Sequence, residues 1–415
     1  MQLVTTPNLV TYEPLGAFFE HDAIYLEELA QEWLRVQHPL PTKIADCVLT
    51  EVMTLEVGIA SWTYFRFTTP RGEAILRANP DGIFPGPVGV TEEPIYQAIL
   101  PDFQSWSRQH PEATLEEKVT TLGQLYRSVR GLQPVVLGQE SGPDCPICHH
   151  HSVCVEGEEG LYSCQSCHLI YRRTMPVEDV LSLYTAENGG YFNQLLEQKK
   201  ADHAHGYEFY EEWIRVIQGA AYLQGRAELF EQLSGQSTGR LLEVGCATGE
   251  ILSVFHHRGW DVTGLELSPF CVRRAKEKYQ LRLHQGTLNE TALPRSSFDL
   301  ALYMDVFEHI ADPQGELHRI HQLLAPGGSL ILELPNQGSL DASILGSDYF
   351  FDEHLFFYTP EAIYTLLESC AFKEIHLMTL HDAYNRVQRF LTDEEARSVV
   401  EELRGERLIV TARKG

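Results

Sequence analysis

A short apolar segment followed by two glycines constrains the fold of the C-terminal half most strongly. Residues 240–244 read Arg-Leu-Leu-Glu-Val, Gly245 and Gly249 follow, and apolar residues at helical spacing begin at Ile251. Glycine lets the backbone turn sharply and lets a ligand approach the main chain, because it has no side chain. The segment therefore predicts a strand, a ligand-binding turn and a helix of a Rossmann-like sheet.

The rest of the C-terminal half continues this alternation of strands and helices. Short apolar runs predict strands, and segments of helical periodicity predict helices. The predicted strands cover 240–244, 261–266, 281–284, 298–304, 329–334, 373–378 and 407–411, and the predicted helices cover 251–258, 269–279, 313–324 and 360–370. The pattern is typical of an α/β fold with a doubly wound, seven-stranded sheet. No clear helical pattern joins the last two strands, so we expect antiparallel pairing at one edge.

Four of the nine cysteines stand in two CxxC pairs, Cys145 with Cys148 and Cys164 with Cys167, and fifteen residues separate the pairs. Four thiolates at this spacing suit a tetrahedral Zn²⁺ ion with no open position, which is typical of a structural zinc ribbon. Alternative ligands are the histidines at 149–151 and Cys154. A redox-active CxxC pair is the alternative function.

The amino-acid composition limits the kinds of partner that the protein can bind. The 415 residues have room for two or three domains, and the formal net charge of −26 would repel a phosphate backbone. We therefore expect no duplex nucleic acid partner. The sequence has no apolar run of about 18 residues and no secretory signal at its start, so we expect a cytoplasmic protein without a membrane partner.

These features predict four segments. They are an N-terminal mixed α/β domain of unknown function at 1–140, the zinc ribbon at 141–175, a helical cap and linker over the active site at 176–235, and the Rossmann-like domain at 236–415. Within the first, we predict a helix from Asp22, a hairpin over 61–78, a loop over 79–89 and a helix over 115–130.

An acidic residue ends the second predicted strand of the Rossmann-like domain. At this point of such a sheet a carboxylate can accept hydrogen bonds from both hydroxyls of a ribose, and Glu266 lies 21 residues after Gly245. The alternative reading is a helix-capping or surface carboxylate. Ala247 and Glu250 stand where a dinucleotide-binding motif requires glycine, so the turn does not predict a pyrophosphate site.

The C-terminal half resembles class I S-adenosylmethionine-dependent methyltransferases. The resemblance rests on E-x-G-x-x-x-G at 243–249, on Glu266, on FDLALYMDVFEHI at 298–310 and on LAPGGSL at 324–330. It implies S-adenosylmethionine as cofactor. The methionine moiety would lie beside Glu243, Gly245, Cys246, Thr248 and Gly249, and Asp305 would face its amino-acid end or the methyl group. The ribose would lie at Glu266 and Leu267, and the adenine beside Thr287 and Leu288. It gives His309 a structural role.

A zinc ribbon before such a domain is similar to a bacterial group that includes deoxysugar C-methyltransferases. The resemblance implies that a Glu-His pair does acid–base work, with His354 as the base and Glu353 orienting it. Tyr349 of the same segment is a further candidate base. In the alternative interpretation, His354 only bonds to the backbone. The aromatic residues Tyr184, Tyr191 and Phe192 precede the domain and either cover the active site or only pack.

We therefore expect methyl transfer to carbon or oxygen of a small molecule, in a natural-product or sugar pathway. The alternative is a protein or carrier-bound acceptor that residues 1–140 and the zinc ribbon recruit. A non-catalytic cofactor-binding scaffold is a third reading, which the glycine turn, Glu266 and Asp305 disfavour.

Overall fold

The computed structural model describes residues 42–44, 47–57, 60–69, 72–79, 82–85, 93–158, 160–173, 182, 184–185, 220–350, 353–380 and 393–415. Contacts divide the chain into two compact units. The first comprises residues 1–98, 193–229 and 383–397, and the second comprises 99–192, 230–382 and 398–415. Helix α2 (Glu93–Gln109) crosses from the first unit into the second.

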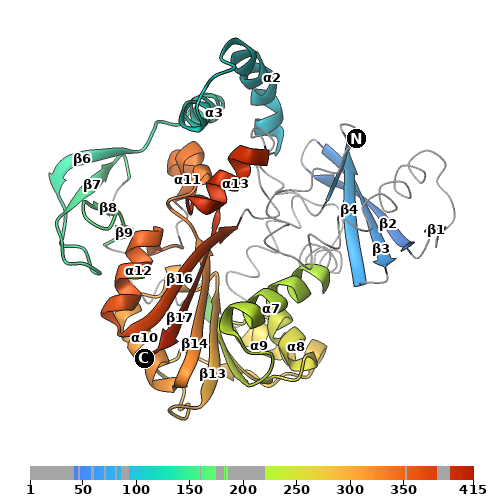
Figure 1. Ribbon diagram of the computed structural model, residues 1–415, viewed down its shortest axis with the longest axis vertical. Coiled ribbons are helices and arrows are strands. Elements are labelled where there is room, and N and C mark those ends of the chain that lie inside the picture. Colours follow the sequence, from blue (N-terminus) through green and yellow to red (C-terminus); the bar gives the residue numbers. More distant parts are fainter. Residues whose placement is uncertain are drawn as a thin grey trace. The chain divides into compact units, whose positions relative to one another are not determined.

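A five-stranded antiparallel sheet lies in the first unit (Figure 1). Its strands follow the chain order: β1 (Thr42–Ile44), β2 (Cys47–Val57), β3 (Ala60–Thr69), β4 (Gly72–Asn79) and β5 (Gly82–Pro85). The pairing of β3 with β4 confirms the predicted hairpin. The predicted loop is wrong over 82–85, because β5 pairs with β4 at the sheet edge, where a proline is tolerated. The helix predicted from Asp22 lies outside the described residues.

The second unit contains a seven-stranded sheet in the order β12-β11-β10-β13-β14-β17-β16. The strands are β10 (Arg240–Val244), β11 (Asp261–Glu266), β12 (His284–Gln285), β13 (Phe298–Met304), β14 (Leu324–Pro335), β16 (Phe372–Leu380) and β17 (Arg407–Lys414). The first five are parallel, and β17 lies antiparallel between β14 and β16. This topology confirms the predicted seven-stranded α/β fold and its antiparallel edge.

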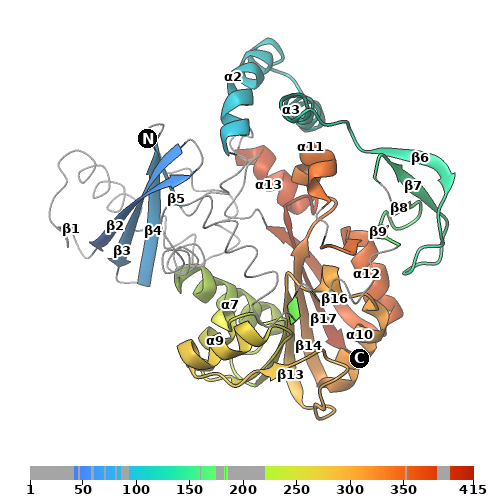
Figure 2. The ribbon, with the colours of Figure 1, turned by 180° about the vertical axis from the view of Figure 1, so that it is seen from behind.

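Helices cover both faces of this sheet. Figures 1 and 2 show α8 (Glu250–His257) and α9 (Pro269–Tyr279) on one face, and α10 (Pro313–Leu323) and α12 (Pro360–Ser369) on the other. Three of these helices begin with the same signal: the side chains of Ser268, Asp312 and Thr359 each accept a backbone N–H, and a proline follows. Each cap contributes about 0.5–2 kcal/mol and explains why these boundaries are readable from the sequence.

Three elements of this unit differ clearly from the prediction. Strand β14 begins at Leu324 and not at Ser329, directly after the end of α10. The third strand begins at His284 and not at Leu281, because the Leu281 amide still bonds to the Ala275 carbonyl at the end of α9. A helix, α13 (Asp393–Glu401), lies between β16 and β17, where the sequence showed no clear helical pattern.

A second antiparallel sheet carries the CxxC pairs. Its strand order is β15-β9-β8-β7-β6, from β6 (Val136–Ser141), β7 (Ser152–Glu156), β8 (Leu161–Cys164), β9 (Ile170–Arg172) and β15 (Phe356–Phe357). Strand β15 belongs to the Rossmann-like part of the chain, yet it completes this sheet by pairing with β9. Buried residues of this sheet, including Cys164 and Leu169, form one continuous hydrophobic core with Leu355, Ile363 and residues of the seven-stranded sheet.

Helix α3 (Leu115–Arg130) confirms the predicted helix and packs against α11 (Leu340–Leu345). Arg127 donates to the carbonyls of Ser343 and Ile344, and Tyr126 donates to the carboxylate of Asp348. Among the described helices, none has the length and apolarity that crossing a membrane requires.

Candidate active site and four-cysteine cluster

The glycine turn lies at the carboxyl end of β10. Gly245 has φ = 71°, and a Cβ atom at this position would lie 2.4 Å from Val306 Cγ2, so only glycine fits without displacement. Gly249, with φ = 81°, begins α8. Because β10 lies between β11 and β13, the turn sits at the point where open α/β sheets bind their ligands.

Glu266 ties this turn to the start of the next helix. One carboxylate oxygen accepts the Ala247 N–H at 2.8 Å, and the other accepts the Ser268 N–H at 2.7 Å. Burial raises the pKa of Glu266, while the two backbone hydrogen bonds lower it. Each oxygen can accept a second hydrogen bond, so both the capping interpretation and the ribose interpretation fit this geometry.

Glu243 is a buried carboxyl at the end of β10. Its side chain is 3% exposed, and among the described residues its Oε2 atom has no hydrogen-bond partner. Burial raises the pKa of Glu243 to about 8, and the negative charges of Glu250 and Glu266 add to the shift. A cationic ligand group would stabilise the ionised form of this carboxyl.

The other predicted cofactor residues lie on the loops around this edge. Cys246 is buried, and burial strongly raises the pKa of its thiol, so it acts here as a small apolar group. The Thr248 hydroxyl donates to the Glu250 carboxylate. The Gly286 N–H donates to the Glu266 carbonyl at 3.0 Å. This bond places the loop after β12 next to β11. Leu267 is partly exposed on this edge, Thr287 follows Gly286 and bonds to Glu290, and Leu288 is buried.

Asp305 directly follows β13 and lies in the left-handed region, with φ = 53°. Its carboxylate pairs with Arg407 Nη2 at 2.5 Å, and Arg407 Nε lies 3.3 Å from the fully buried Glu333 carboxylate. The sequence analysis did not identify Arg407. The antiparallel pairing of β17 with β14 explains its place, because the first residue of β17 lies at the edge where the parallel strands end.

A cluster of one carboxyl and two imidazoles lies on the same edge. Glu308 and His309 belong to the 3-10 turn η1 (Phe307–His309) after β13, and His354 precedes β15. Glu308 Oε1 lies 4.0 Å from His309 Nε2 and 4.0 Å from His354 Nε2, and the three ligand atoms lie within 4.8 Å of one another. Glu308 is 2% exposed, and among the described residues neither of its oxygens has a hydrogen-bond partner.

The electrostatics of the cluster follow from its burial. Burial raises the pKa of Glu308, and the charge of Asp305 adds to this. Burial lowers the pKa of His309, and it lowers the pKa of His354 to about 3, with neighbouring His309 and Arg407 contributing. Both imidazoles are therefore neutral near pH 7.

The predicted catalytic residues hold different positions around this cluster. The Glu353 main-chain carbonyl lies 2.8 Å from His309 Nδ1, while the carboxyl 4.0 Å from His354 is that of Glu308. Tyr349 is buried, and burial raises the pKa of its hydroxyl, with Asp341 adding to the shift. The Tyr184 ring meets the His309 ring edge-on at 6.0 Å. Tyr191 and Phe192 lie outside the described residues.

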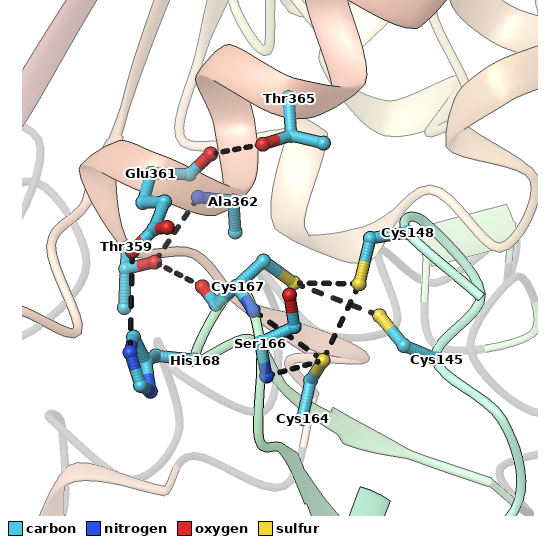
Figure 3. Close-up of polar contacts among 10 residues, drawn as sticks. All are labelled: Cys145, Cys148, Cys164, Ser166, Cys167, His168, Thr359, Glu361, Ala362 and Thr365. Carbon is cyan, nitrogen blue, oxygen red and sulfur yellow. Dashed lines mark hydrogen bonds and ion pairs between the residues drawn. The ribbon is translucent and has the colours of Figure 1, made fainter. Parts of the chain in front are cut away.

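The four cysteines of the CxxC pairs converge on one point (Figure 3). Three separations between their sulfur atoms are 3.4, 3.5 and 3.7 Å. Zn–S bonds of about 2.3 Å in a tetrahedron require about 3.8 Å between sulfurs, whereas a disulfide requires about 2.05 Å. The donor set therefore fits a tetrahedral thiophilic ion. Residues 149–151 are exposed and, with Cys154, lie outside this group.

The cysteine-bearing sheet holds the segment that carries His354. Besides the pairing of β9 with β15, the Arg172 side chain donates to the carbonyls of His354 at 3.2 Å and Phe350 at 3.3 Å. The Thr359 hydroxyl donates to the Cys167 carbonyl at 2.9 Å (Figure 3). The position of the His354 main chain thus depends on the sheet that the cysteines stabilise.

Comparison with known proteins finds a methyltransferase family match and distant relatives. Residues 192–377 match a family model described as a methyltransferase domain. The ubiquinone biosynthesis O-methyltransferase of Bradyrhizobium sp. (strain ORS 278) is 32% identical over 116 residues, which are 26% of this chain and 46% of that protein. The enzyme of the same name from Salmonella arizonae is 26% identical over 172 residues, 38% of this chain and 70% of that protein.

Solved structures of similar fold include an S-adenosylmethionine-dependent methyltransferase from Thermotoga maritima, described as a possible histamine N-methyltransferase. It is 20% identical, covers 50% of this chain and 95% of its own, and superposes with a TM-score of 0.36. The chain spans about half the length of the first curated relatives that it matches. Residues 192–377 therefore contain a methyltransferase domain.

Proposed function

We propose that the protein transfers a methyl group from S-adenosylmethionine to oxygen or carbon of a small molecule. The observation that carries this proposal is the joint position of Gly245 and Glu266, where a bare backbone turn and a buried carboxylate meet at the carboxyl edge of the sheet. The family match over this region supports the same cofactor.

In the proposed complex, the methionine moiety lies beside Glu243, the glycine turn and Asp305, the ribose lies at Glu266 and Leu267, and the adenine lies beside Thr287 and Leu288. The buried carboxyl of Glu243 supports this orientation, since S-adenosylmethionine carries a sulfonium and an ammonium group at its methionine end. Cys246 and Thr248 shape the loop between the two glycines.

The acceptor side is the cluster of Glu308, His309 and His354 together with Tyr349. A cluster this polar on the face of an otherwise apolar core fits an acceptor that presents hydroxyl groups. The curated relatives are named as O-methyltransferases, which favours oxygen as the acceptor atom. Sugars and natural products with free hydroxyls are the acceptor classes we propose.

We propose that His354 promotes loss of the acceptor's proton and that Glu353 positions His309 through its main-chain carbonyl. Tyr349 closes the buried side of the same site. The protein otherwise contributes alignment, because methyl transfer from a sulfonium is an in-line displacement.

We also propose that Cys145, Cys148, Cys164 and Cys167 hold a structural Zn²⁺ ion. The sulfur separations and the absence of any non-thiolate ligand in the described cluster support a closed site, which stabilises a fold and has no position for substrate.

Cofactor binding and turnover test the proposal separately. Calorimetry with S-adenosylhomocysteine should show binding that falls at least tenfold in Glu266→Ala. The matched control Asp261→Ala changes an exposed carboxyl at the other end of β11 and should bind normally. For turnover, a panel of hydroxylated sugars and phenols is screened for S-adenosylhomocysteine release. His354→Ala should lower the rate by about 10²–10⁴ with unchanged cofactor affinity. Absence of cofactor binding in the unaltered protein would refute the proposed function.

A further inference from the structure

We propose that Glu308, His309 and His354 bind a divalent transition-metal ion, a second metal site distinct from the four-cysteine cluster. The ion would bind a hydroxyl group of the methyl acceptor. The role toward the acceptor rests on the proposed methyltransferase function, whereas ion binding itself does not.

The separations of the three ligand atoms fit a shared ion. Two separations are 4.0 Å, and the third is at most 4.8 Å. The point equidistant from three atoms so arranged lies at most ~2.5 Å from each, compared with ~2.0–2.2 Å for zinc bonds to imidazole nitrogen and carboxylate oxygen. Side-chain shifts of a few tenths of an ångström would therefore complete the coordination.

A hydrogen bond fixes the tautomer of the His309 imidazole. His309 Nδ1 lies 2.8 Å from the Glu353 carbonyl oxygen, which can only accept, so Nδ1 carries the proton. In the neutral ring, Nε2 then presents its lone pair toward Glu308. A backbone carbonyl that holds the distal nitrogen of a histidine is the usual outer partner of a metal-binding imidazole.

The Glu308 carboxyl has little compensation in the described structure. Its own backbone N–H and the charge of Arg407 lower its pKa, but burial and the charge of Asp305 outweigh them. Glu308 is 2% exposed, and neither oxygen has a hydrogen-bond partner among the described residues. At 4.0 Å, the imidazole nitrogens are beyond hydrogen-bond distance, so a proton shared with them does not satisfy the oxygens. Buried charges in proteins are paired or coordinate metals, and a cation between these three ligand atoms would compensate the Glu308 carboxylate.

The donor set selects the class of ion. Two imidazole nitrogens and one carboxylate suit Zn²⁺, Mn²⁺, Fe²⁺ or Co²⁺, whereas Mg²⁺ and Ca²⁺ prefer oxygen ligands. Three protein ligands leave coordination positions open, in contrast to the four thiolates of the cysteine cluster. An open site at the carboxyl edge of β13 can accept a further oxygen ligand.

An acceptor hydroxyl is the ligand that this position favours. An ion lowers the pKa of a bound hydroxyl, which then releases its proton to water. The resulting oxygen forms the new bond to the methyl carbon while the carbon–sulfur bond breaks, and its electron pair stays on sulfur as the neutral thioether. A phenol or enol, whose hydroxyl ionises readily, is the expected acceptor class. His354 then promotes proton loss by holding the ion.

Cobalt substitution tests the site in the full chain. Thiolate ligation gives Co²⁺ intense charge-transfer absorption, and nitrogen–oxygen ligation does not, so the two sites are distinguishable. The unaltered protein should bind two Co²⁺ ions per chain. Glu308→Gln and His354→Gln should each bind one, with the thiolate absorption retained. Cys164→Ser should lose that absorption and bind the second ion more weakly, because the cysteine-bearing sheet holds the His354 main chain.

Two controls keep the outcome interpretable. His321→Gln removes another partly buried imidazole, on α10, and should bind two ions. Calorimetry with S-adenosylhomocysteine reports whether each variant still binds the cofactor, independently of metal content. One ion per chain in the unaltered protein, or two ions in Glu308→Gln, would overturn the proposal. Two ions in a protein that binds no cofactor would support the site and refute the methyltransferase function.

Discussion

Replacing Glu243 with glutamine should make the protein more stable at neutral and alkaline pH. Folding buries the Glu243 carboxyl and raises its pKa from 4.5 to about 8. At about 1.36 kcal/mol per pKa unit, this difference corresponds to roughly 5 kcal/mol. The glutamine side chain of Glu243→Gln fills the same space and cannot ionise. It therefore removes the contribution of this carboxyl to the pH dependence of stability without creating a cavity.

The sign follows from which state holds the proton. Below about pH 4.5 the carboxyl is protonated in both the folded and unfolded states, and it contributes no pH dependence. As the pH rises toward 8, the unfolded chain loses this proton while the folded protein keeps it, so stability falls with pH. Above about pH 8 both states are ionised and the cost is constant. The stability difference between Glu243→Gln and the unaltered protein should therefore grow across this window to about 5 kcal/mol.

Urea titrations at pH 5.5, 7 and 8.5, followed by circular dichroism without cofactor, measure this difference. Glu368→Gln, which changes an exposed carboxyl on α12, is the matched control and should follow the unaltered protein at each pH. If Glu243→Gln also follows the unaltered protein at all three pH values, the carboxyl is not desolvated in the folded state and the reasoning is refuted.

Three further predictions concern the turn, the cofactor and the metal. Calorimetry in buffers of different ionisation enthalpy should show that S-adenosylmethionine binding at pH 7 releases a proton from Glu243. If no proton is released, the methionine end of the cofactor does not lie beside Glu243. Gly245→Ala should lower the free energy of unfolding by about 2–4 kcal/mol. The loss has two causes: alanine is strained in the left-handed backbone conformation, and its Cβ atom clashes with Val306. Val306→Ala should restore part of this loss, and no restoration would argue against the contact. Cys167→Ser should remove zinc from the cysteine cluster, as measured by elemental analysis. Amide hydrogen exchange over residues 354–358 should then become faster. Unchanged slow exchange would show that the cysteine-bearing sheet is stable without metal.

The sequence predicts three of the five parallel strands at their observed bounds because their signals are local. Strands β10, β11 and β13 have the predicted bounds, since each is a short apolar run that a glycine, serine or acidic residue ends. Helix α9 likewise begins at its predicted proline, because Ser268 caps it from within the same segment.

Contacts between distant segments account for what the sequence did not reveal. No local pattern links Arg407 to Asp305, which is 102 residues away, because the pairing of β17 with β14 creates that contact. The place of β15 in the cysteine-bearing sheet is equally non-local. Glu308 stood in the segment 298–310 on which the resemblance rests, but its lack of a hydrogen-bond partner among the described residues depends on burial that only the fold provides.

The two sides of the proposed active site, the proposed cofactor side and the proposed acceptor side, depend on different parts of the fold. The cofactor side is held by bonds among β10, β11 and the loops that follow them, through Glu266 and the Gly245 N–H. The acceptor side depends on the cysteine-bearing sheet, because β9 pairs with β15 and Arg172 holds the main chain at His354. Both sheets share one hydrophobic core, so the cysteine-bearing sheet is part of the same folded unit as the seven-stranded sheet. A loss of metal from the cysteines should therefore reach acceptor positioning first and leave the cofactor contacts intact.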